Sequence, residues 1–404
     1  MAANFARECS ALVRQSNAAA LAGRLALASS DSPKRQFLDF LAARPYQAGF
    51  QECERCMQAD WAELVCHSGK AAQCKRDGDL STAFSHQEAA VEAFLRLFKQ
   101  MDRSWIPILK VLLVDLRKLG AQADDNLRAQ GKMEEANKLE GAGRMMRKSL
   151  AQEMRDEEND KEVCRTHAAL FVANQCNKVF FALNTLKHVK SLVLPPQVAV
   201  EEFPAPDRVT WHFFQGRMAL MEGRMEQAEQ DLAFSFNNTP SRHIHNRHVI
   251  LGYLVPVRLI LHQSRPSPTR KAAIPTPALL RKYKLTELVS LVEAFRTGNI
   301  AMFDEAMAEH QDFFIRKSIY LLLHKLKLCV YRNLFKRAHA ATKKSQMKLS
   351  IFVAAVRACG AEADPEQVEG MLANLIHQGL VKGYIAHKQQ VVVLKKDDPF
   401  RTNS

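Results

Sequence analysis

The sequence contains few of the residues that mark special architectures. Among 404 residues there are only 16 glycines, 15 prolines, 3 tryptophans and 6 tyrosines. So little glycine and proline excludes a collagen-like or low-complexity chain, and 47% apolar with 25% charged residues excludes a mostly disordered one. Nine cysteines, an odd number at irregular spacing, exclude a disulfide-based miniprotein and are typical of reduced thiols in the cytosol or nucleus.

Long apolar runs are also missing. The longest, 105–116 and 249–261, are interrupted by proline and charged residues and fall short of the roughly 20 residues that cross a bilayer. The amino-terminal stretch carries an early Glu8 and no sustained apolar core, so no secretory signal is visible. We therefore expect a soluble protein of the cell interior that does not insert into membranes.

Motifs of the common catalytic sites are absent: there is no GxxxxGK[ST], GxGxxG, GxSxG or HExxH. Two clusters of metal-binding residue types remain. Cys53 and Cys56 have the spacing of a zinc ligand pair, but no matching second pair follows Cys66, His67 and Cys74. We interpret these cysteines as buried thiols of a helix over 50–65.

The second cluster holds three histidines, His243, His245 and His248. No carboxylate lies nearby to complete a metal site, and Arg242 and Arg247 would repel a cation. We interpret the segment as a basic loop between helices. The sequence therefore predicts neither an enzyme nor a cofactor.

Positive charge is concentrated in one part of the chain. Residues 1–240 hold 31 basic and 31 acidic residues, whereas residues 241–404 hold 26 basic and 12 acidic residues. The entire net charge of +14 thus belongs to the carboxyl-terminal two-fifths. A segregated positive field favours a polyanionic partner, such as nucleic acid, an acidic protein or an anionic membrane surface.

Helical periodicity dominates most of the chain, and Pro195, Pro196 and Pro204 mark a boundary. After this boundary, 208–240 has the pattern of a tetratricopeptide-type helix pair. Its small residues, Gly216 and Ala228, predict a close approach of the two helices. Because one helix pair cannot bury its apolar face alone, we expect stacked neighbours. Residues 262–278, with four prolines, are predicted to form a basic surface loop.

The carboxyl-terminal end changes character. A short helix is predicted over 349–359, and a second one begins at Pro365 and ends at Gly379. Two strand-like runs follow, 381–386 and 391–395. Two helices followed by a two-stranded ribbon form a winged-helix pattern. We predict an all-α fold of tetratricopeptide-like repeats with a carboxyl-terminal winged helix, divided into residues 1–205, 206–340 and 341–404.

Helical repeats that lead into a winged helix resemble the PCI domain family. The specific resemblance lies in Phe313-Phe-Ile-Arg, in Tyr331-Arg-Asn-Leu-Phe-Lys-Arg and in Leu372-Ala-Asn-Leu-Ile-His-Gln-Gly-Leu-Val-Lys-Gly-Tyr-Ile-Ala-His. It is strong over 206–400 and weaker over 85–125. Subunits of the proteasome lid, the signalosome and translation initiation factor three share this domain. The details are most similar to the branch that serves the nuclear-pore, TREX-type transcription-and-export complex.

The resemblance implies a role and partners. It implies a non-enzymatic scaffold of messenger RNA export, in the nucleus at the pore and also in the cytoplasm. The expected partners are a larger PCI-containing scaffold subunit, which pairs with the winged helix, and a small acidic protein of the Dss/Sem type. The alternative is a structural subunit of a signalosome-, lid- or initiation-factor-like complex that does not bind nucleic acid.

The basic residues around the winged helix predict where RNA or DNA would bind. Residues 365–380, the expected recognition helix, contain no lysine or arginine, which argues against reading of base edges. Phosphate contacts without sequence choice are expected instead. Tyr384 and Phe352 have rings that can stack on bases, but we expect both to pack in the core. The predicted surface consists of Arg332, Lys336, Arg337, Lys343, Lys344, Lys348, Lys382, Lys388, Lys395 and Lys396.

Overall fold

The computed structural model describes residues 3–29, 31–152, 165–194, 199–264 and 274–400. The chain divides into two compact units, Met1–Trp211 (unit 1) and His212–Ser404 (unit 2), which are described separately. None of the helices in the described residues is both long and apolar enough to cross a membrane. The division into three parts at 205/206 and 340/341 stays a prediction.

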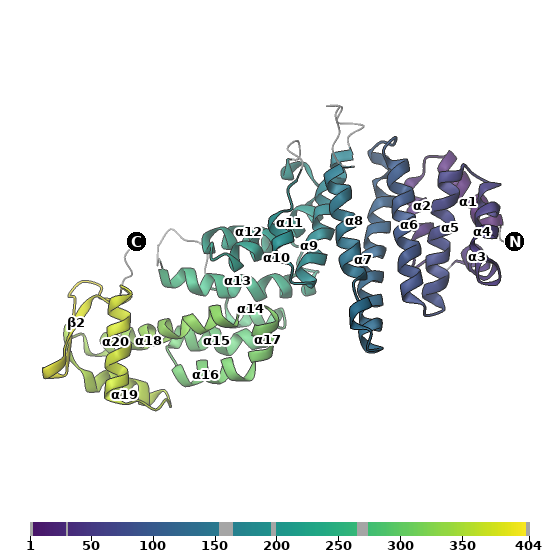
Figure 1. Cartoon of the computed structure of the whole chain (residues 1–404). Coiled ribbons are helices and arrows are strands. Elements are labelled where there is room, and N and C mark those ends of the chain that lie inside the picture. Colours follow the sequence, from purple (N-terminus) through teal and green to yellow (C-terminus); the bar gives the residue numbers. More distant parts are fainter. Residues whose placement is uncertain (1–2, 30, 153–164, 195–198, 265–273, 401–404) are drawn as a thin grey trace. The chain divides into compact units, whose positions relative to one another are not determined.

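The described part of unit 1 is helical (Figure 1). Each of the longer helices from α5 to α9 packs against the next one along the chain, which is how helical repeats bury their apolar faces. The helices are α1 Ala3–Arg14, α2 Ala18–Leu25, α3 Ser32–Ala43, α4 Tyr46–Glu54, α5 Ala59–Arg76, α6 Leu80–Phe98, α7 Ile106–Ala129, α8 Lys138–Gln152, α9 Ala169–Ala182 and α10 Leu186–Lys190, while α11, Ala205–Met221, crosses the boundary. Short 3₁₀ turns lie at Arg103–Trp105, Met133–Glu135, Arg165–Ala168 and Val200–Glu202.

Local sequence explains where several of these helices begin. The side chains of Asn17, Asp31 and Asp79 each accept a hydrogen bond from a backbone N–H in the first turn of the helix that follows. Pro107 occupies the first turn of α7, where its missing N–H costs nothing. The single helix predicted over 50–65 is wrong, because α4 ends at Glu54 and α5 begins at Ala59.

Unit 2 has one continuous apolar core that extends from α11 to Phe400. Its helices are α12 Met225–Asn238, α13 Ile244–Ser264, α14 Pro277–Lys282, α15 Thr286–Thr297, α16 Ile300–Glu309, α17 Gln311–Arg316, α18 Tyr320–Thr342, α19 Leu349–Ala358 and α20 Pro365–His377. The loop predicted over 262–278 is wrong at its start, because α13 continues to Ser264. Most of the remaining loop lies outside the described residues.

The helix pair predicted from small residues is confirmed. A Cβ atom placed on Gly216 of α11 would lie 2.7 Å from Leu232 Cγ of α12, so any larger residue would force Leu232 to shift. Ala228 and Leu232 are fully buried, and Gly223 makes the turn with a φ of +79°. The two helices therefore pack as closely as a tetratricopeptide-type pair requires.

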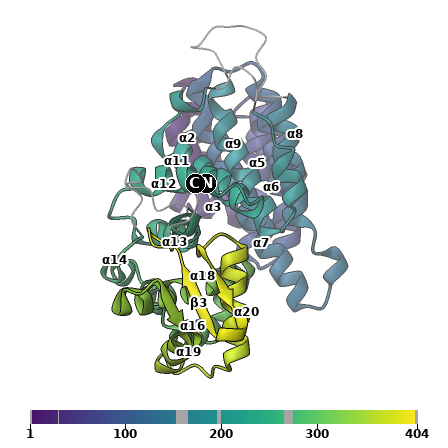
Figure 2. The ribbon, with the colours of Figure 1, turned by 90° about the vertical axis from the view of Figure 1, so that its left-hand side faces the viewer.

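The carboxyl-terminal winged helix is confirmed, with one strand more than predicted (Figure 2). Strands β1 (Gln346–Lys348), β2 (Gly383–Ala386) and β3 (Val391–Leu394) form an antiparallel sheet in the order β1-β3-β2, and a 3₁₀ turn, His387–Gln389, joins β2 to β3. Helices α19 and α20 pack against α18 and against each other. A Cβ atom on Gly383 would overlap the Val393 carbonyl, so glycine is needed for β2 to pair with β3.

Candidate nucleic-acid interface

The winged-helix sheet has one buried and one exposed face, because successive side chains of a strand alternate. Three apolar side chains of the strands point into the core: Met347, Val392 and Leu394. The register places six residues on the other face, in two cross-strand rows: Gln346, Val393 and Tyr384, then Lys348, Val391 and Ala386. This exposed face combines apolar, aromatic and basic side chains.

Lysines gather at one end of the exposed face. Lys395 N donates to Lys382 O at 2.9 Å, so these two lysines are neighbours across β3 and β2. On the other side of β3, Leu394 N donates to Ser345 O at 2.7 Å, which brings Lys344 to the same end of the sheet. Like charges that lie opposite one another destabilise a sheet. A bound anion would remove this repulsion.

Acidic residues are absent from the three strands and from the turn between β2 and β3, and Asp397 and Asp398 follow directly after Lys396. Residues 343–348 and 382–396 together contain seven lysines and no aspartate or glutamate. Six of the seven are exposed and Lys382 is half-buried. None of them forms an ion pair within the part of the chain that the structure describes. We call these seven residues the lysine surface: Lys343, Lys344, Lys348, Lys382, Lys388, Lys395 and Lys396.

The three predicted residues of α18 lie in different environments. Lys336 and Arg337 are exposed, but the Arg337 guanidinium donates to Thr297 O at 2.5 Å. Arg332 is only 5% exposed and donates to the Phe400 carbonyl oxygen, and burial lowers its pKa. This burial removes Arg332 from the surface predicted from the sequence. Its guanidinium holds the carboxyl-terminal segment against α18 instead of facing a phosphate.

The two aromatic candidates differ as well. Phe352 is fully buried and packs edge-on against Phe335 at 5.2 Å between ring centroids, so its predicted place in the core is confirmed. The same prediction is wrong for Tyr384, which is 62% exposed. The strand pattern could have shown this, since Tyr384 lies one position from Ile385 and three from the buried Val381, and odd offsets fall on opposite faces.

Helix α20 has the chemistry of a packing helix. Val368, Leu372 and Leu375 are buried, and the helix ends before Gly379, whose φ is +70°. His387 Nδ1, in the turn between β2 and β3, lies 2.6 Å from Glu369 Oε1 of this helix. Without a lysine or arginine, this helix has none of the bidentate donors that bind guanine. The lysine surface, which contacts phosphates in our interpretation, is therefore the better candidate interface.

The metal-binding clusters considered above do not converge. Cys53 is buried, whereas Cys56 is half-buried beyond the end of α4. His245 and His248 lie within α13, where His248 Nδ1 is 2.9 Å from Tyr283 O, so the loop predicted for these two histidines is in fact the start of a helix. Among the described residues, no group of three or more His, Cys, Asp or Glu side chains is placed to hold a metal ion.

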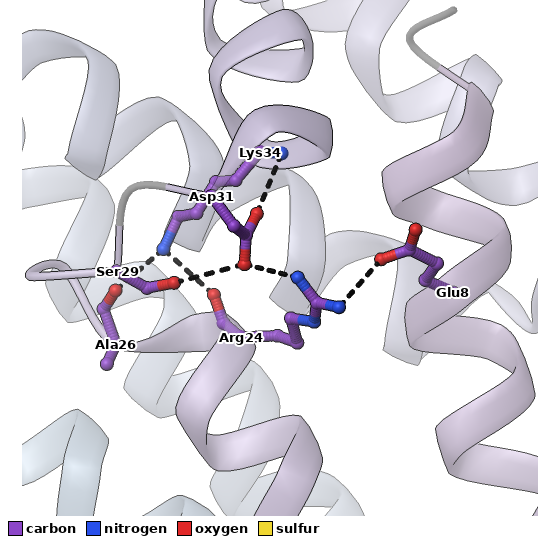
Figure 3. Close-up of polar contacts among 6 residues, drawn as sticks. All are labelled: Glu8, Arg24, Ala26, Ser29, Asp31 and Lys34. Carbon is purple, nitrogen blue, oxygen red and sulfur yellow. Dashed lines mark hydrogen bonds and ion pairs between the residues drawn. The ribbon is translucent and has the colours of Figure 1, made fainter.

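A charged network in unit 1 has a structural role (Figure 3). Lys34 is 1% exposed, and its ammonium donates to Arg24 O at 2.8 Å and to Ala26 O at 2.6 Å. These carbonyls lie at the carboxyl-terminal end of α2, where helices leave acceptors unsatisfied. Asp31 caps α3 and pairs with Arg24, which also pairs with Glu8 at 3.2 Å. The charges compensate one another and join three helices.

Comparison with known proteins agrees with the fold. The family model described as "PCI domain" matches residues 307–396, which include α18 and the winged helix. A helical array that ends in this domain defines a PCI-domain protein, a class whose members are scaffold subunits of multi-subunit complexes.

Individual relatives refine this placement. The chain is 30% identical to "PCI domain-containing protein 2" of Danio rerio, over 87% of this chain and 86% of the relative. It is 33% identical to "Enhanced ethylene response protein 5" of Arabidopsis thaliana, over 85% and 81%. It is 24% identical to "Protein CSN12 homolog" of Yarrowia lipolytica, over 80% and 82%. The chain belongs to the PCI domain-containing protein 2 family.

Proposed function

We propose that this chain is a non-enzymatic scaffold subunit of a nuclear messenger RNA export assembly of the TREX type, located at the nuclear pore and also present in the cytoplasm. Its winged helix docks a larger PCI-containing subunit, and a small acidic protein of the Dss/Sem type braces the assembly. The lysine surface holds RNA or DNA without choosing a sequence. The proposal of export follows from the family, and the proposal of nucleic-acid binding follows from the sheet.

The observation that carries the nucleic-acid role is the concentration of seven lysines on and around one sheet whose strands hold no acidic residue, with no ion pair to any of the seven among the described residues. Nucleic acid is a dense polyanion, and each phosphate neutralised by lysine releases a condensed counterion. Binding of this kind is strong at low salt and weakens steeply as salt rises. Because α20 carries no lysine or arginine, the phosphates around the sheet, not the base edges, provide the attraction.

Charge reversal tests this surface. The variant K344E/K395E/K396E is titrated with labelled single-stranded RNA at several salt concentrations, in the full-length chain. We expect affinity to fall about 10- to 100-fold at low salt, and the salt slope to fall by about 2, since each single-strand phosphate contact contributes roughly 0.7. The matched control is K132E/K148E/K187E, which makes the same change of net charge on exposed lysines of unit 1. Equal losses in both variants would contradict the assigned surface.

The alternative function is a structural subunit of a signalosome-, proteasome-lid- or initiation-factor-like complex without nucleic-acid binding. Purification of the tagged chain from nuclear extract separates the two. Recovery of a large PCI subunit, a small acidic protein and pore components supports the export role. Recovery of signalosome, lid or initiation-factor subunits would overturn the export role, and the lysine surface would then be a protein-docking surface.

A further inference from the structure

Tyr384 projects from the exposed face of the winged-helix sheet. Of the described residues, it is the only aromatic side chain among the large apolar side chains that are strongly exposed, at 62%. Within those residues its hydroxyl has no hydrogen-bond partner and its ring contacts no other ring. Aromatic side chains normally bury most of their area, so an exposed ring on a sheet is available to a ligand.

The neighbours of Tyr384 define the chemistry of that ligand. Val393 lies directly opposite the ring, and Gln346 lies beyond Val393 in the same row. Lys382 and Lys395 occupy the adjacent row on the same face. Opposite and diagonal partners in a sheet lie about 4.5–8 Å apart, so the ring stands within reach of two ammonium groups. A ligand on this face would meet an apolar platform bordered by positive charge.

We infer that this face is a stacking platform for an unpaired base of single-stranded nucleic acid, with the Tyr384 ring against the base and the lysines on the adjacent phosphates. The inference rests on the proposed nucleic-acid role and adds a preference for single strands over duplex. In a duplex both faces of each base are covered by its neighbours, whereas an unpaired base can leave the stack and lie on an aromatic ring.

The charge pattern favours nucleic acid over a protein as the occupant. No acidic residue lies on the three strands. The lysines at the strand ends repel each other, and a bound anion would offset this repulsion. A base with its phosphates supplies an aromatic plane and two or more negative charges at close spacing. Docking of a partner protein on the same face is the competing outcome, and the experiment is designed to detect it.

The test compares Y384A with Y384F in the full-length chain. Probes are a fluorescein-labelled 15-nucleotide oligouridylate and an RNA duplex of 15 base pairs, measured by anisotropy at fixed salt. We expect Y384A to weaken binding of the single strand about tenfold, as loss of one stacked base does, and to leave duplex binding within twofold. Y384F keeps the ring and should bind as the parent does. L321A, which removes another exposed side chain from α18 of the same unit, is the control and should change neither.

A second readout locates the contact. Oligouridylate carrying 5-iodouridine should crosslink to Tyr384 on irradiation, and mass spectrometry should find the modified peptide within 383–394.

The outcomes separate the inference from the function on which it rests. Unchanged single-strand affinity in Y384A, together with a loss in K344E/K395E/K396E, would overturn stacking and keep the lysine surface. No loss in either variant would overturn both. If Y384A binds RNA normally but fails to retain the larger PCI subunit, the platform is a protein interface and the inference is wrong.

Discussion

Unit 1 and the lysine surface of unit 2 differ in how their charged side chains are paired. In unit 1, charged side chains neutralise each other: Arg76 pairs with Asp39 at 2.7 Å, Arg96 with Glu63 at 2.5 Å, and Lys110 with Asp207 at 3.1 Å. In unit 2 the lysine surface has no acidic partner among the described residues. Net charge along the sequence thus indicates where charged side chains lack partners within the fold, whereas it says nothing about networks whose charges cancel.

The difference has an energetic consequence. Exposed ion pairs contribute about 0–1 kcal/mol each, so most of the pairs in unit 1 matter little individually. Lys34 is the exception, because it is buried with two carbonyl acceptors. The lysine surface should contribute nothing to stability, or reduce it slightly. Substitutions in the two units therefore separate charge that supports the fold from charge that binds a ligand.

The chain offers a convenient readout for this comparison. All three tryptophans, Trp61, Trp105 and Trp211, belong to unit 1. Trp211 lies on the boundary helix α11, so tryptophan fluorescence follows mainly the unfolding of unit 1 through Trp61 and Trp105, whereas far-ultraviolet circular dichroism follows the helices of both units.

The largest effect is expected from G298A in unit 2. Gly298 ends α15 with a φ of +73°, and a Cβ atom there would lie 2.5 Å from Leu334 N of α18. We expect unit 2 to lose about 2–4 kcal/mol, since both the strained backbone and the clash with α18 must be accommodated. Circular dichroism should show an earlier transition, with the tryptophan transition unchanged.

Gly223 provides the matched control, because its φ is +79° but a Cβ atom added to it would meet no other atom within 4 Å. G223A should cost only about 1 kcal/mol, the conformational part alone. Equal losses for G298A and G223A would show that the contact with α18 is unimportant.

The next effect concerns the buried ammonium of unit 1. K34M keeps the length of the side chain but leaves the carbonyls of Arg24 and Ala26 without their donor. We expect a loss of about 1–3 kcal/mol in the tryptophan transition, the range for a buried acceptor left unsatisfied. K343M in unit 2 removes an exposed lysine and should change stability by less than about 0.5 kcal/mol. A neutral K34M would mean that the burial cost of the ammonium cancels its hydrogen bonds.

A pH effect is also expected in unit 1. His67 Nδ1 lies 2.9 Å from His86 Nδ1, and the Tyr46 ring packs on both histidines, near Glu63 and Arg96. Burial and the neighbouring His86 lower the pKa of His67 from 6.5 to about 4. The unfolded chain therefore binds the extra proton first, so stability is complete above pH 6.5 and falls as the pH drops toward 4.

The loss in unit 1 should be roughly 1–2 kcal/mol, because partial exposure screens the effect. Denaturant titrations at pH 7 and pH 5, followed by tryptophan fluorescence, measure it. The variant H67Q should show a smaller difference between the two pH values. The same difference in H67Q and in the parent would assign the acid sensitivity to other groups.

These examples also show how far sequence alone reaches. Helix α20, the close pair at Gly216 and the winged helix followed from local patterns, because periodicity, caps and small residues act over a few positions. Strand β1 could not be predicted, since three residues, Gln-Met-Lys, carry no periodic signal and form a strand only because β3 is there to pair with them.

The candidate site could likewise be predicted only where its residues follow a local pattern. Lys344, Lys348, Lys382 and Lys395 fall on the exposed face of the sheet because strand alternation is local. Arg332 was misplaced because its partner, Phe400, lies 68 positions along the chain, and no local pattern shows such a contact. Lys34 gave no signal either, since the carbonyls it binds are defined only once α2 and α3 have packed.

The smallest expected effect tests the comparison most directly. K395Q removes one of the facing lysines at the end of the sheet and keeps a polar side chain of similar length. Because Lys395 lies opposite Lys382, relief of their repulsion should raise the stability of unit 2 by about 0.2–0.5 kcal/mol at low salt. The gain should shrink as salt rises, since a Debye length of about 10 Å at 0.1 M screens exposed charges.

The control for K395Q is K336Q, which changes an exposed lysine of α18 and should be neutral. Denaturant titration by circular dichroism measures both variants at about 20 mM salt, where exposed charges interact, and at about 500 mM salt, where they are screened. A loss of stability in K395Q would contradict the repulsion and imply a folded-state partner for this lysine. A gain, set beside the loss in K34M, means that neutralising a lysine acts with opposite sign in the two units. That sign distinguishes an ammonium whose hydrogen bonds stabilise the fold from an ammonium that repels a neighbouring lysine.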